Sequence, residues 1–446
     1  MKISQIQTNN PLILKDDGIY YERKIDWFLN QWKQTANHLP LVIKGLRQSG
    51  KSKSIIHFAI SHYKTVFYVD FRNHPEYDKL FSDYDVDNIK ERLSIEFGFT
   101  GWKEKETLLI FDEIQDCPIA RGSLKNFCID GRYDVIASGS MLGISGYNDK
   151  CKQYIPVGYE RVVEFHPLDF EEFLWVYGLN KEMTDLFRDA IKEVKPIDPS
   201  IHEAMIRLFR TYLIVGGMPS VVKEYFLNRD LASVRDAQIG LMASYRDDFG
   251  KHLGEDGGTA IRSLEKAKIN LVLDSMPAQL TREMGSKFTY NAIADSHAKG
   301  SKYAGAIEWL LDYGLLSRCP SLSKLDVVQA GYASERNFKL YFADTGLFVS
   351  QLDPSFARSI YFDSLSDFKG AIYENVAADP FSKSGRRLYY YEIGYQNEID
   401  FVTTYQGKIA LVEVKAKKGK VHNTEKFVEN QPNKDDYLIL KLTSQN

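Results

Sequence analysis

Short apolar runs alternate with helical spacing of apolar residues over the first part of the chain. Residues 41–43 form an apolar run typical of a buried strand, and three further runs, TVFYVDF, TLLIFDE and YDVIASGS, predict three more strands. Residues 18–36 and 54–63 have the apolar spacing of helices. Strands that alternate with helices predict a parallel sheet covered by helices on both faces. We therefore expect an α/β domain over residues 1–180.

The pattern changes after this domain. Long helical patterns, broken by the turn Gly216–Pro219, predict a helical subdomain over residues 181–270. Over residues 271–345, a helix that runs through a glycine into a strand predicts a winged-helix module. Residues 346–446 carry a helix and then four strand-like runs, RRLYYYEI, EIDFVTTY, KIALVEVKA and DYLILKL. This last region predicts a small second α/β domain.

Composition excludes several classes of protein. The 446 residues are 44% hydrophobic and 26% charged, which is typical of a globular chain and not of a disordered one. The net charge of −3 gives no overall signal for nucleic acid or for an anionic membrane. We find no run of 18 apolar residues and no apolar segment of a secretion signal, so we expect no membrane partner. Four scattered cysteines indicate free thiols and a cytoplasmic location; they are Cys117, Cys128, Cys151 and Cys319.

The segment GLRQSGKS follows the first strand and precedes a helix, and it matches the pattern G-x-x-x-x-G-K-S. Its glycines let backbone N–H groups turn toward phosphate oxygens, and the helix start adds a positive end. Lys51 is expected to reach the β and γ phosphates, while the Ser52 hydroxyl ligates magnesium. We therefore predict a nucleotide-binding loop made of Gly45, Leu46, Arg47, Gln48, Ser49, Gly50, Lys51, Ser52 and Lys53.

Two carboxylates, Asp112 and Glu113, end the apolar strand LLIF. Ligands of open α/β sheets bind at the carboxyl ends of the strands, which is where these side chains are expected. Asp112 would hold hydrated magnesium, and Glu113 would activate the attacking water as a general base. The alternative is an acidic turn that is simply solvated.

Two weaker candidates complete this site. Ser138 ends the fourth strand and could sense the γ-phosphate, although Ser-Gly-Ser is also ordinary turn chemistry. Arg161, in GYERVVEF, is a candidate for stabilising charge on the transferred phosphoryl group. A surface ion pair with neighbouring glutamates is the competing interpretation of Arg161.

The order of these motifs resembles the prokaryotic AAA-type ATPases that carry a C-terminal DUF4143 region. Further segments shared with that family are YLIVGGMPSVV, SMPAQL, AIEWLLDYGLL, FKLYFADTGLF and FKGAIYENVAA, so the resemblance covers nearly the whole chain. It implies ATP as the nucleotide, a first sensor at Ser138 and a matching arginine at Arg161. Hydrolysis in such ATPases often needs an arginine from a neighbouring subunit, which implies a homo-oligomer.

A second set of charged residues occurs near the C-terminus. Asp400 lies in one predicted strand, and Glu413 and Lys415 lie two apart in the next, so the latter two face the same side. Two carboxylates on adjacent strands can hold a divalent cation, and a lysine beside them can orient water. With Glu374 on the preceding helix, the set resembles the PD-(D/E)xK nuclease core and implies a second Mg²⁺ or Mn²⁺ site. The alternative is a solvated face of a hairpin.

Three functions fit these motifs. The first is a magnesium-dependent ATPase that acts as a switch or motor and is coupled to a nuclease-like module acting on DNA. The second is a nucleotide-gated regulatory protein whose C-terminal module binds nucleic acid or a partner without cutting. The third is a small-molecule kinase, against which the Asp-Glu pair argues. The first two differ only in the roles of Asp400, Glu413 and Lys415.

Overall fold

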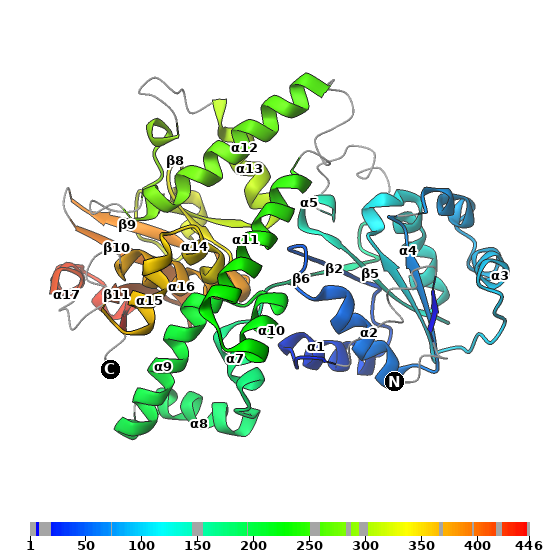
Figure 1. The fold of residues 1–446 in the computed structure, drawn as a ribbon, viewed down its shortest axis with the longest axis horizontal. Coiled ribbons are helices and arrows are strands. Elements are labelled where there is room, and N and C mark those ends of the chain that lie inside the picture. The colour runs from blue at the N-terminus through cyan, green and yellow to red at the C-terminus, as the bar shows by residue number, and fades with distance from the viewer. Residues whose placement is uncertain are drawn as a thin grey trace. The chain divides into compact units, whose positions relative to one another are not determined.

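The computed structural model describes most of the chain. The described residues are 6–8, 19–72, 74–144, 155–193, 195–249, 259–281, 287–293, 302–364, 369–394, 397–415 and 422–443. They form two compact units (Figure 1). The first comprises Met1–Leu168 with Trp175–Leu179, and the second comprises Asp169–Leu174 with Asn180–Asn446. The division into four domains that the sequence indicates stays a prediction.

The first unit is built on a six-stranded parallel sheet. Its order is β1-β3-β4-β5-β2-β6, and every neighbouring pair is parallel. The strands are β1 (Ile6–Thr8), β2 (Leu41–Gly45), β3 (Thr65–Asp70), β4 (Thr107–Asp112), β5 (Asp134–Ser140) and β6 (Arg161–Phe165). The predicted α/β class with a parallel sheet is therefore confirmed. Strands β1 and β6 were not predicted from the sequence. Strand β1 has only three residues, and three of the five residues of β6 are exposed.

Helices cover both faces of this sheet. They are α1 (Lys24–Gln34), α2 (Lys51–His62), α3 (Val86–Phe97), α4 (Pro118–Asp130) and α5 (Met141–Ile144), with 3₁₀ turns η3 (Pro75–Phe81) and η4 (Ile114–Asp116); helix α7 (Phe170–Tyr177) is divided between the two units. The predicted leading helix over residues 18–36 is shorter in the structure. It begins after Arg23, whose backbone is extended and whose N–H donates to the Asp26 carboxylate at 2.9 Å. This capping interaction stops the helix from extending toward the N-terminus.

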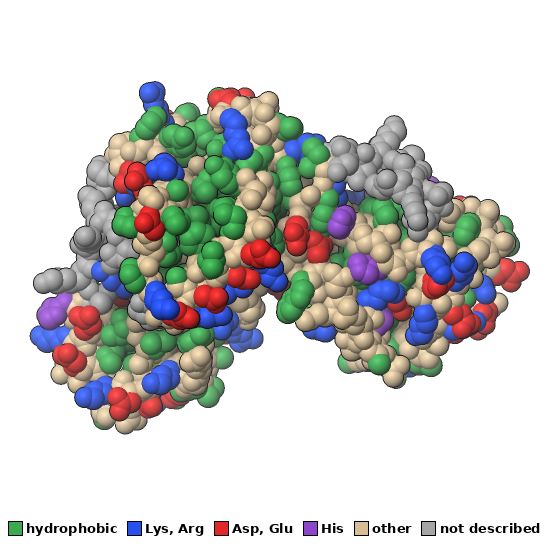
Figure 2. Space-filling model, turned by 90° about the horizontal axis from the view of Figure 1, so that it is seen from below, with side chains coloured by type: hydrophobic (Ala, Val, Ile, Leu, Met, Phe, Trp, Pro, Cys, Tyr) green, Lys and Arg blue, Asp and Glu red, His purple; other side chains and the backbone are tan. Residues whose placement is uncertain are grey.

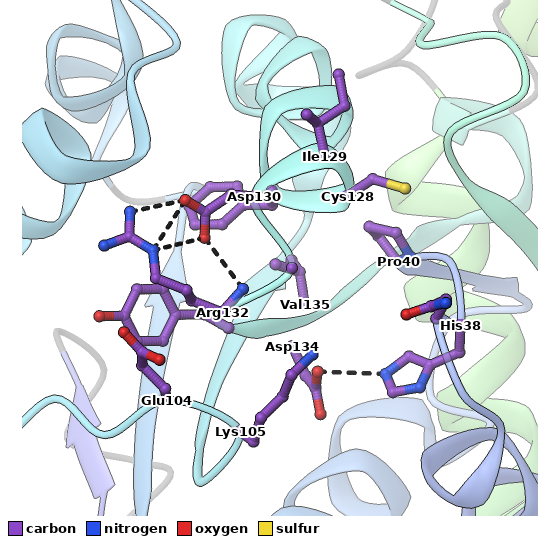
Figure 3. Close-up of a pocket in the computed structure, with 14 residues that line it drawn as sticks. His38, Pro40, Glu104, Lys105, Cys128, Ile129, Asp130, Arg132, Asp134 and Val135 are labelled. Carbon is purple, nitrogen blue, oxygen red and sulfur yellow. Dashed lines mark hydrogen bonds and ion pairs between the residues drawn. The ribbon is translucent and has the colours of Figure 1, made fainter.

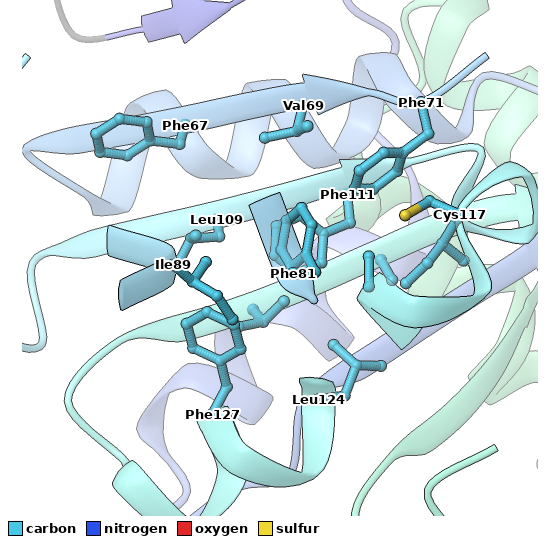
Figure 4. Packing of buried hydrophobic residues seen from close by; sticks show 14 of the residues in the cluster. Phe67, Val69, Phe71, Phe81, Ile89, Leu109, Phe111, Cys117, Leu124 and Phe127 are labelled. Carbon is cyan, nitrogen blue, oxygen red and sulfur yellow. The ribbon is translucent and has the colours of Figure 1, made fainter. Parts of the chain in front are cut away.

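Alternation along the strands separates two cores. One face directs Phe67, Val69, Leu109 and Phe111 toward η3, α3 and α4, and aromatic rings fill this core (Figure 4). The other face packs alternate residues of the same strands against α1 and α2; among them are Val66, Tyr68, Leu108 and Ile110. A strand that is buried on both faces needs apolar residues at nearly every position, which explains the continuous runs in the sequence.

The second unit begins with helices and continues as a mixed sheet. Its helices are α8 (Lys181–Lys192), α9 (Pro199–Val215), α10 (Pro219–Asn228), α11 (Leu231–Asp248), α12 (Thr259–Leu280), α13 (Ala304–Tyr313), α14 (Thr345–Ser350), α15 (Pro354–Tyr361), α16 (Lys369–Lys383) and α17 (His422–Glu429). Short 3₁₀ turns are η5 (Tyr290–Ala292), η7 (Gln329–Tyr332) and η8 (Lys434–Asp436).

The second sheet joins two regions that the sequence assigned to different modules. Its strands are β7 (Leu316–Leu322), β8 (Ala333–Phe342), β9 (Tyr389–Ile393), β10 (Asn397–Tyr405), β11 (Lys408–Lys415) and β12 (Tyr437–Thr443), in the order β12-β11-β10-β9-β7-β8. The antiparallel β7–β8 hairpin lies where a winged helix was expected, and β7 pairs in parallel with β9. The hairpin therefore extends the C-terminal sheet.

The Gly216–Gly217 elbow packs on the start of α14. The Asp344 carboxylate accepts hydrogen bonds from the backbone N–H groups of Gly217 at 2.6 Å and Leu347 at 2.9 Å. A Cβ at Gly216, where φ is +73°, would lie 2.2 Å from an Asp344 oxygen. The segments YLIVGGMPSVV and FKLYFADTGLF are thus in direct contact, and this contact is structural.

Candidate functional site

The loop Gly45–Ser52 connects the carboxyl end of β2 to the start of α2. Gly50 has φ of +99° and forms the N-cap of α2, a conformation that glycine adopts without strain. At Gly45 a Cβ would lie 2.2 Å from the carbonyl oxygen of Phe165, so a larger residue would push β6 away. The loop is therefore shaped by its two glycines, and it ends on a helix N-terminus that favours an anion.

Lys51 is the first residue of α2, at the end of this loop. Its ammonium group donates to the carbonyl oxygens of Gly45 and Leu46, each at 2.9 Å. Burial lowers the pKa of Lys51 to about 8, although the nearby carboxylates of Glu113 and Asp112 oppose that shift. The ammonium is partly buried and its hydrogen-bond partners are neutral, so a phosphate would add a negatively charged partner beside it.

Asp112 brings three of the predicted residues together. Its carboxylate accepts a hydrogen bond from the Ser52 hydroxyl at 3.2 Å and from the Ser138 hydroxyl at 2.5 Å. The same carboxylate accepts a hydrogen bond from the Tyr68 hydroxyl, which sequence reasoning missed. Burial, together with Asp112, raises the pKa of Tyr68 well above its usual value, so it stays a donor. The only sequence signal was a tyrosine within an otherwise apolar strand.

Glu113 occupies the adjacent position and is already paired. Its backbone φ is +54°, which is uncommon for a residue with a side chain. Its carboxylate lies 2.6 Å from an Arg72 guanidinium nitrogen and accepts from the Gln115 amide at 2.5 Å. Arg72 also lies 3.5 Å from Asp116. Neither Arg72 nor Gln115 was expected, because both are reached through irregular segments that follow β3 and β4.

Arg161 lies away from the loop. It begins β6 opposite Leu41, whereas the loop leaves β2 at Gly45, at the other end of the strand. The Arg161 guanidinium carbon is 4.8 Å from the centre of the Phe28 ring. The structure therefore does not bring Arg161 to the loop of its own chain, because a strand of five residues separates them. The buried ion pair nearby belongs instead to Glu160 and Arg121, at 2.7 Å.

Arg23, which immediately precedes α1, forms hydrogen bonds with the backbone of the loop. Its guanidinium donates to the carbonyl oxygen of Ser49 at 3.2 Å and to that of His166 at 2.7 Å. It also lies 4.7 Å from the centre of the Phe165 ring. The signal was present in the sequence as YYERKIDW, but nothing in the spacing indicated that this arginine reaches the loop.

The C-terminal candidates share one face of the second sheet. Because alternate residues face the same side, the pairing of β10 with β11 aligns Asp400 with Glu413, two residues before Lys415. Glu374 comes from α16, which contacts β11 and β8. The structure therefore brings together the residues that the sequence singled out.

Two further residues, Lys339 and Glu398, belong to this centre and were not expected. Lys339 of β8 is fully buried, and its ammonium lies 3.4 Å from the Glu374 carboxylate and 2.5 Å from that of Glu398. On the other side, Lys415 lies 2.6 Å from Glu413 and 3.9 Å from Asp400. Two lysines thus face four carboxylates.

Each carboxylate in this centre already accepts from a protein donor. Glu413 accepts from the Thr424 hydroxyl, and Asp400 accepts from the Val414 backbone N–H at 2.7 Å. Glu374 accepts from the Tyr341 hydroxyl at 3.1 Å. Burial and, secondly, the nearby Glu374 charge raise the pKa of Asp400 to about 7. Among the residues that the structure describes, no group of three or more acidic, histidine or cysteine side chains is arranged to hold a metal ion.

A cavity of about 540 Å³ lies at the amino end of β5, away from the loop (Figure 3). Its charged groups largely neutralise one another. Arg132 pairs with Asp130 at 2.7 Å, and His38 lies 3.2 Å from Asp134 (Figure 3). We assign no ligand to this cavity, because these charges already have partners.

Comparisons with known proteins agree with the two-part organisation. Residues 37–174 match the family model AAA_14, an AAA domain. Residues 206–355 match DUF8612 and residues 369–444 match DUF4143, both domains of unknown function. A search of curated proteins finds no match.

The solved structures that match this chain are distant from it. The Aeropyrum pernix ORC2 protein in its ADPNP-ADP complexes has 12% identity and a TM-score of 0.36, over 83% of this chain and 98% of that chain. The ORC1 protein of Aeropyrum pernix in complex with DNA has 13% identity and a TM-score of 0.28, over 84% and 98%. Such low scores support no conclusion about function.

Proposed function

The chain is a P-loop ATPase of the AAA type with a C-terminal DUF4143 region, and on that premise we propose that it binds and hydrolyses ATP with magnesium as a nucleotide-dependent switch. Lys51 supports this proposal most directly. Partial burial makes the charged form of Lys51 less favourable, and its present hydrogen-bond partners are neutral carbonyl groups. A bound polyphosphate would stabilise the ammonium by direct charge attraction. The N–H groups at the start of α2 would bind the same phosphates.

Ser52 and Asp112 fit a hydrated magnesium ion. Both supply oxygen ligands, which is the donor type that magnesium prefers, and they already lie 3.2 Å apart. Magnesium would neutralise phosphate charge and polarise the γ-phosphoryl group. Ser138 shares the Asp112 carboxylate and would hold that carboxylate in place, in keeping with a sensor role.

Glu113 would take the proton from the attacking water. In the structure its carboxylate pairs with Arg72, and this pairing would hold it away from a water. We propose that this arrangement is a resting state, and that hydrolysis requires Glu113 to leave Arg72. Arg161 would act only on a neighbouring copy in a homo-oligomer, because it lies away from the loop of its own chain.

The C-terminal module divides the two versions of this function. Glu374, Asp400, Glu413 and Lys415 together support a nuclease-like module, and DNA is then the expected partner. The lysine pairing of its carboxylates favours the version in which the module binds or regulates without cutting. Acidic and basic side chains are intermixed on the face of the molecule seen in Figure 2.

Nucleotide binding and turnover test the ATPase proposal. We expect Lys51→Met to lose both, whereas Lys64→Met at the opposite edge of the sheet keeps both. Lys64 is a suitable control because it is an exposed lysine that pairs with Glu106. Wild-type turnover in Lys51→Met would refute the proposal.

Cleavage of labelled DNA with Mg²⁺ or Mn²⁺, with and without ATP, decides between the two versions when wild type is compared with Lys415→Ala.

A further inference from the structure

We infer that Lys339 supplies the cation of the C-terminal carboxylate centre, so that strand β8 completes this centre and no divalent metal is needed there. The inference goes beyond ATP hydrolysis and concerns only the second unit. It contradicts the metal site that the nuclease-like pattern implies.

The position of Lys339 in the sheet makes this possible. Lys339 pairs with Cys319 across the β7–β8 hairpin. The ammonium then lies 5.2 Å from the centre of the Tyr390 ring on β9. It ends between Glu398 of β10 and Glu374 of α16. Lys339 of the edge strand β8 and Glu398 of β10 therefore reach each other across the intervening strands.

The ammonium is firmly charged. Although burial alone would lower the pKa of Lys339, the carboxylates of Glu374 and Glu398 together with the Tyr341 hydroxyl reverse that effect and raise it well above its usual value. A buried lysine stays protonated only when such partners compensate for the lost hydration. The position that a metal ion would fill in a carboxylate centre is thus held by a covalently attached cation.

The donor set does not fit magnesium or manganese. These ions need several carboxylate or water oxygens close together in octahedral geometry. Here the Glu374 carboxylate accepts hydrogen bonds from Lys339 and Tyr341, and the Glu398 carboxylate accepts one from Lys339. Lys415 and Thr424 engage the two Glu413 oxygens, one each. A metal ion would have to displace two ammonium groups, which repel it.

Manganese titration of the full chain without nucleotide tests this inference, with bound Mn²⁺ counted by electron paramagnetic resonance. We expect wild type and Asp400→Asn to bind the same number of ions. Lys339→Met is expected to gain one ion, because it frees Glu374 and Glu398, and to lose that ion again when Asp400→Asn is added. Added Mn²⁺ should then raise the Tm of Lys339→Met and leave that of wild type unchanged.

Lys287→Met is the matched control. Lys287 is bridged to Lys339 in the backbone and pairs with Glu392 at 2.8 Å, but it is partly exposed. We expect its Tm and manganese count to equal those of wild type, while Lys339→Met loses at least about 5 °C of Tm. One ion bound by wild type and lost in Asp400→Asn would overturn the inference. That comparison needs only the wild-type lysine, so it decides even if Lys339→Met does not fold.

Discussion

Lys51 is a partly buried lysine of the first unit and Lys339 a fully buried lysine of the second, and their environments are opposite. Lys51 donates to two neutral carbonyl groups, and burial lowers its pKa to about 8. Lys339 lies between two carboxylates that raise its pKa well above the usual value. Both occur in sites with acidic residues on neighbouring strands, so residue types alone do not distinguish them.

The difference shows how to separate a binding site from a structural centre. A buried charge that lacks an opposite charge is costly, and a protein keeps it where a ligand later compensates for the cost. A buried charge that is already compensated stabilises the fold and has little to offer a ligand. This criterion favours our proposals that the P-loop edge is the reactive site and that the C-terminal centre is structural.

The largest expected effect comes from Glu113→Gln. This substitution removes the general base, so we expect ATP turnover to fall by about 10² to 10⁴, while ATP binding persists because Lys51 is intact. The same change in the other centre, Glu413→Gln, should leave turnover unchanged. Steady-state hydrolysis and nucleotide binding by both variants measure this. Equal turnover in Glu113→Gln and wild type would remove the contrast between the two sites.

Lys339→Met should be the most destabilising lysine substitution. It leaves Glu374 and Glu398 partly buried without their cation, which costs about 3–5 kcal/mol of unfolding free energy. Lys287→Met, on the same sheet, should cost no more than about 1 kcal/mol. Urea unfolding of both variants measures the difference. Similar losses would mean that Lys339 is no more than an ordinary ion pair.

Lys51→Met should have the opposite sign. At pH 7 the folded protein bears the cost of partly burying a charged Lys51 whose hydrogen-bond partners are neutral carbonyl groups, so we expect the nucleotide-free variant to be more stable than wild type by about 1–3 kcal/mol. The folded-state pKa of about 8 lies below the unfolded value of 10.5. The wild-type penalty is therefore complete below pH 8 and is relieved as pH rises from 8 to 10.5. Unfolding at pH 7, 8.5 and 10 should show the advantage shrinking. Destabilisation at all three values would contradict this explanation.

Local pattern and spacing predicted that several residues around Asp112 lie together. The parallel sheet and the carboxyl-edge position follow from continuous apolar runs and from the loop GLRQSGKS, so Ser52, Asp112 and Ser138 could be placed together. Arg161 could not be placed, because it depends on the register of β6, a strand whose exposed residues give no apolar run. Its distance from the loop became evident only from the pairing with β2.

The C-terminal centre was predicted only in part. Spacing placed Asp400, Glu413 and Lys415 on one face, since they lie on neighbouring strands. The decisive residue, Lys339, is 35 residues before Glu374 in the chain and lies on a hairpin that seemed to belong to another module. Among the described strands, the pairing of β7 with β9 joins that hairpin to the sheet. Residue patterns in the sequence do not reveal such long-range pairing.

The smallest expected effect tests whether the P-loop edge rests in a restrained state. Arg72 holds Glu113 in a partly exposed ion pair, which is worth up to about 1 kcal/mol. If Glu113 must leave this pair before it can act, Arg72→Gln should raise basal turnover at saturating ATP by up to about fivefold. Arg132→Gln, at the opposite edge and paired with Asp130, is the control and should not change turnover. A fall in turnover would show that Arg72 assists the phosphates directly, and the pair with Glu113 would then be incidental.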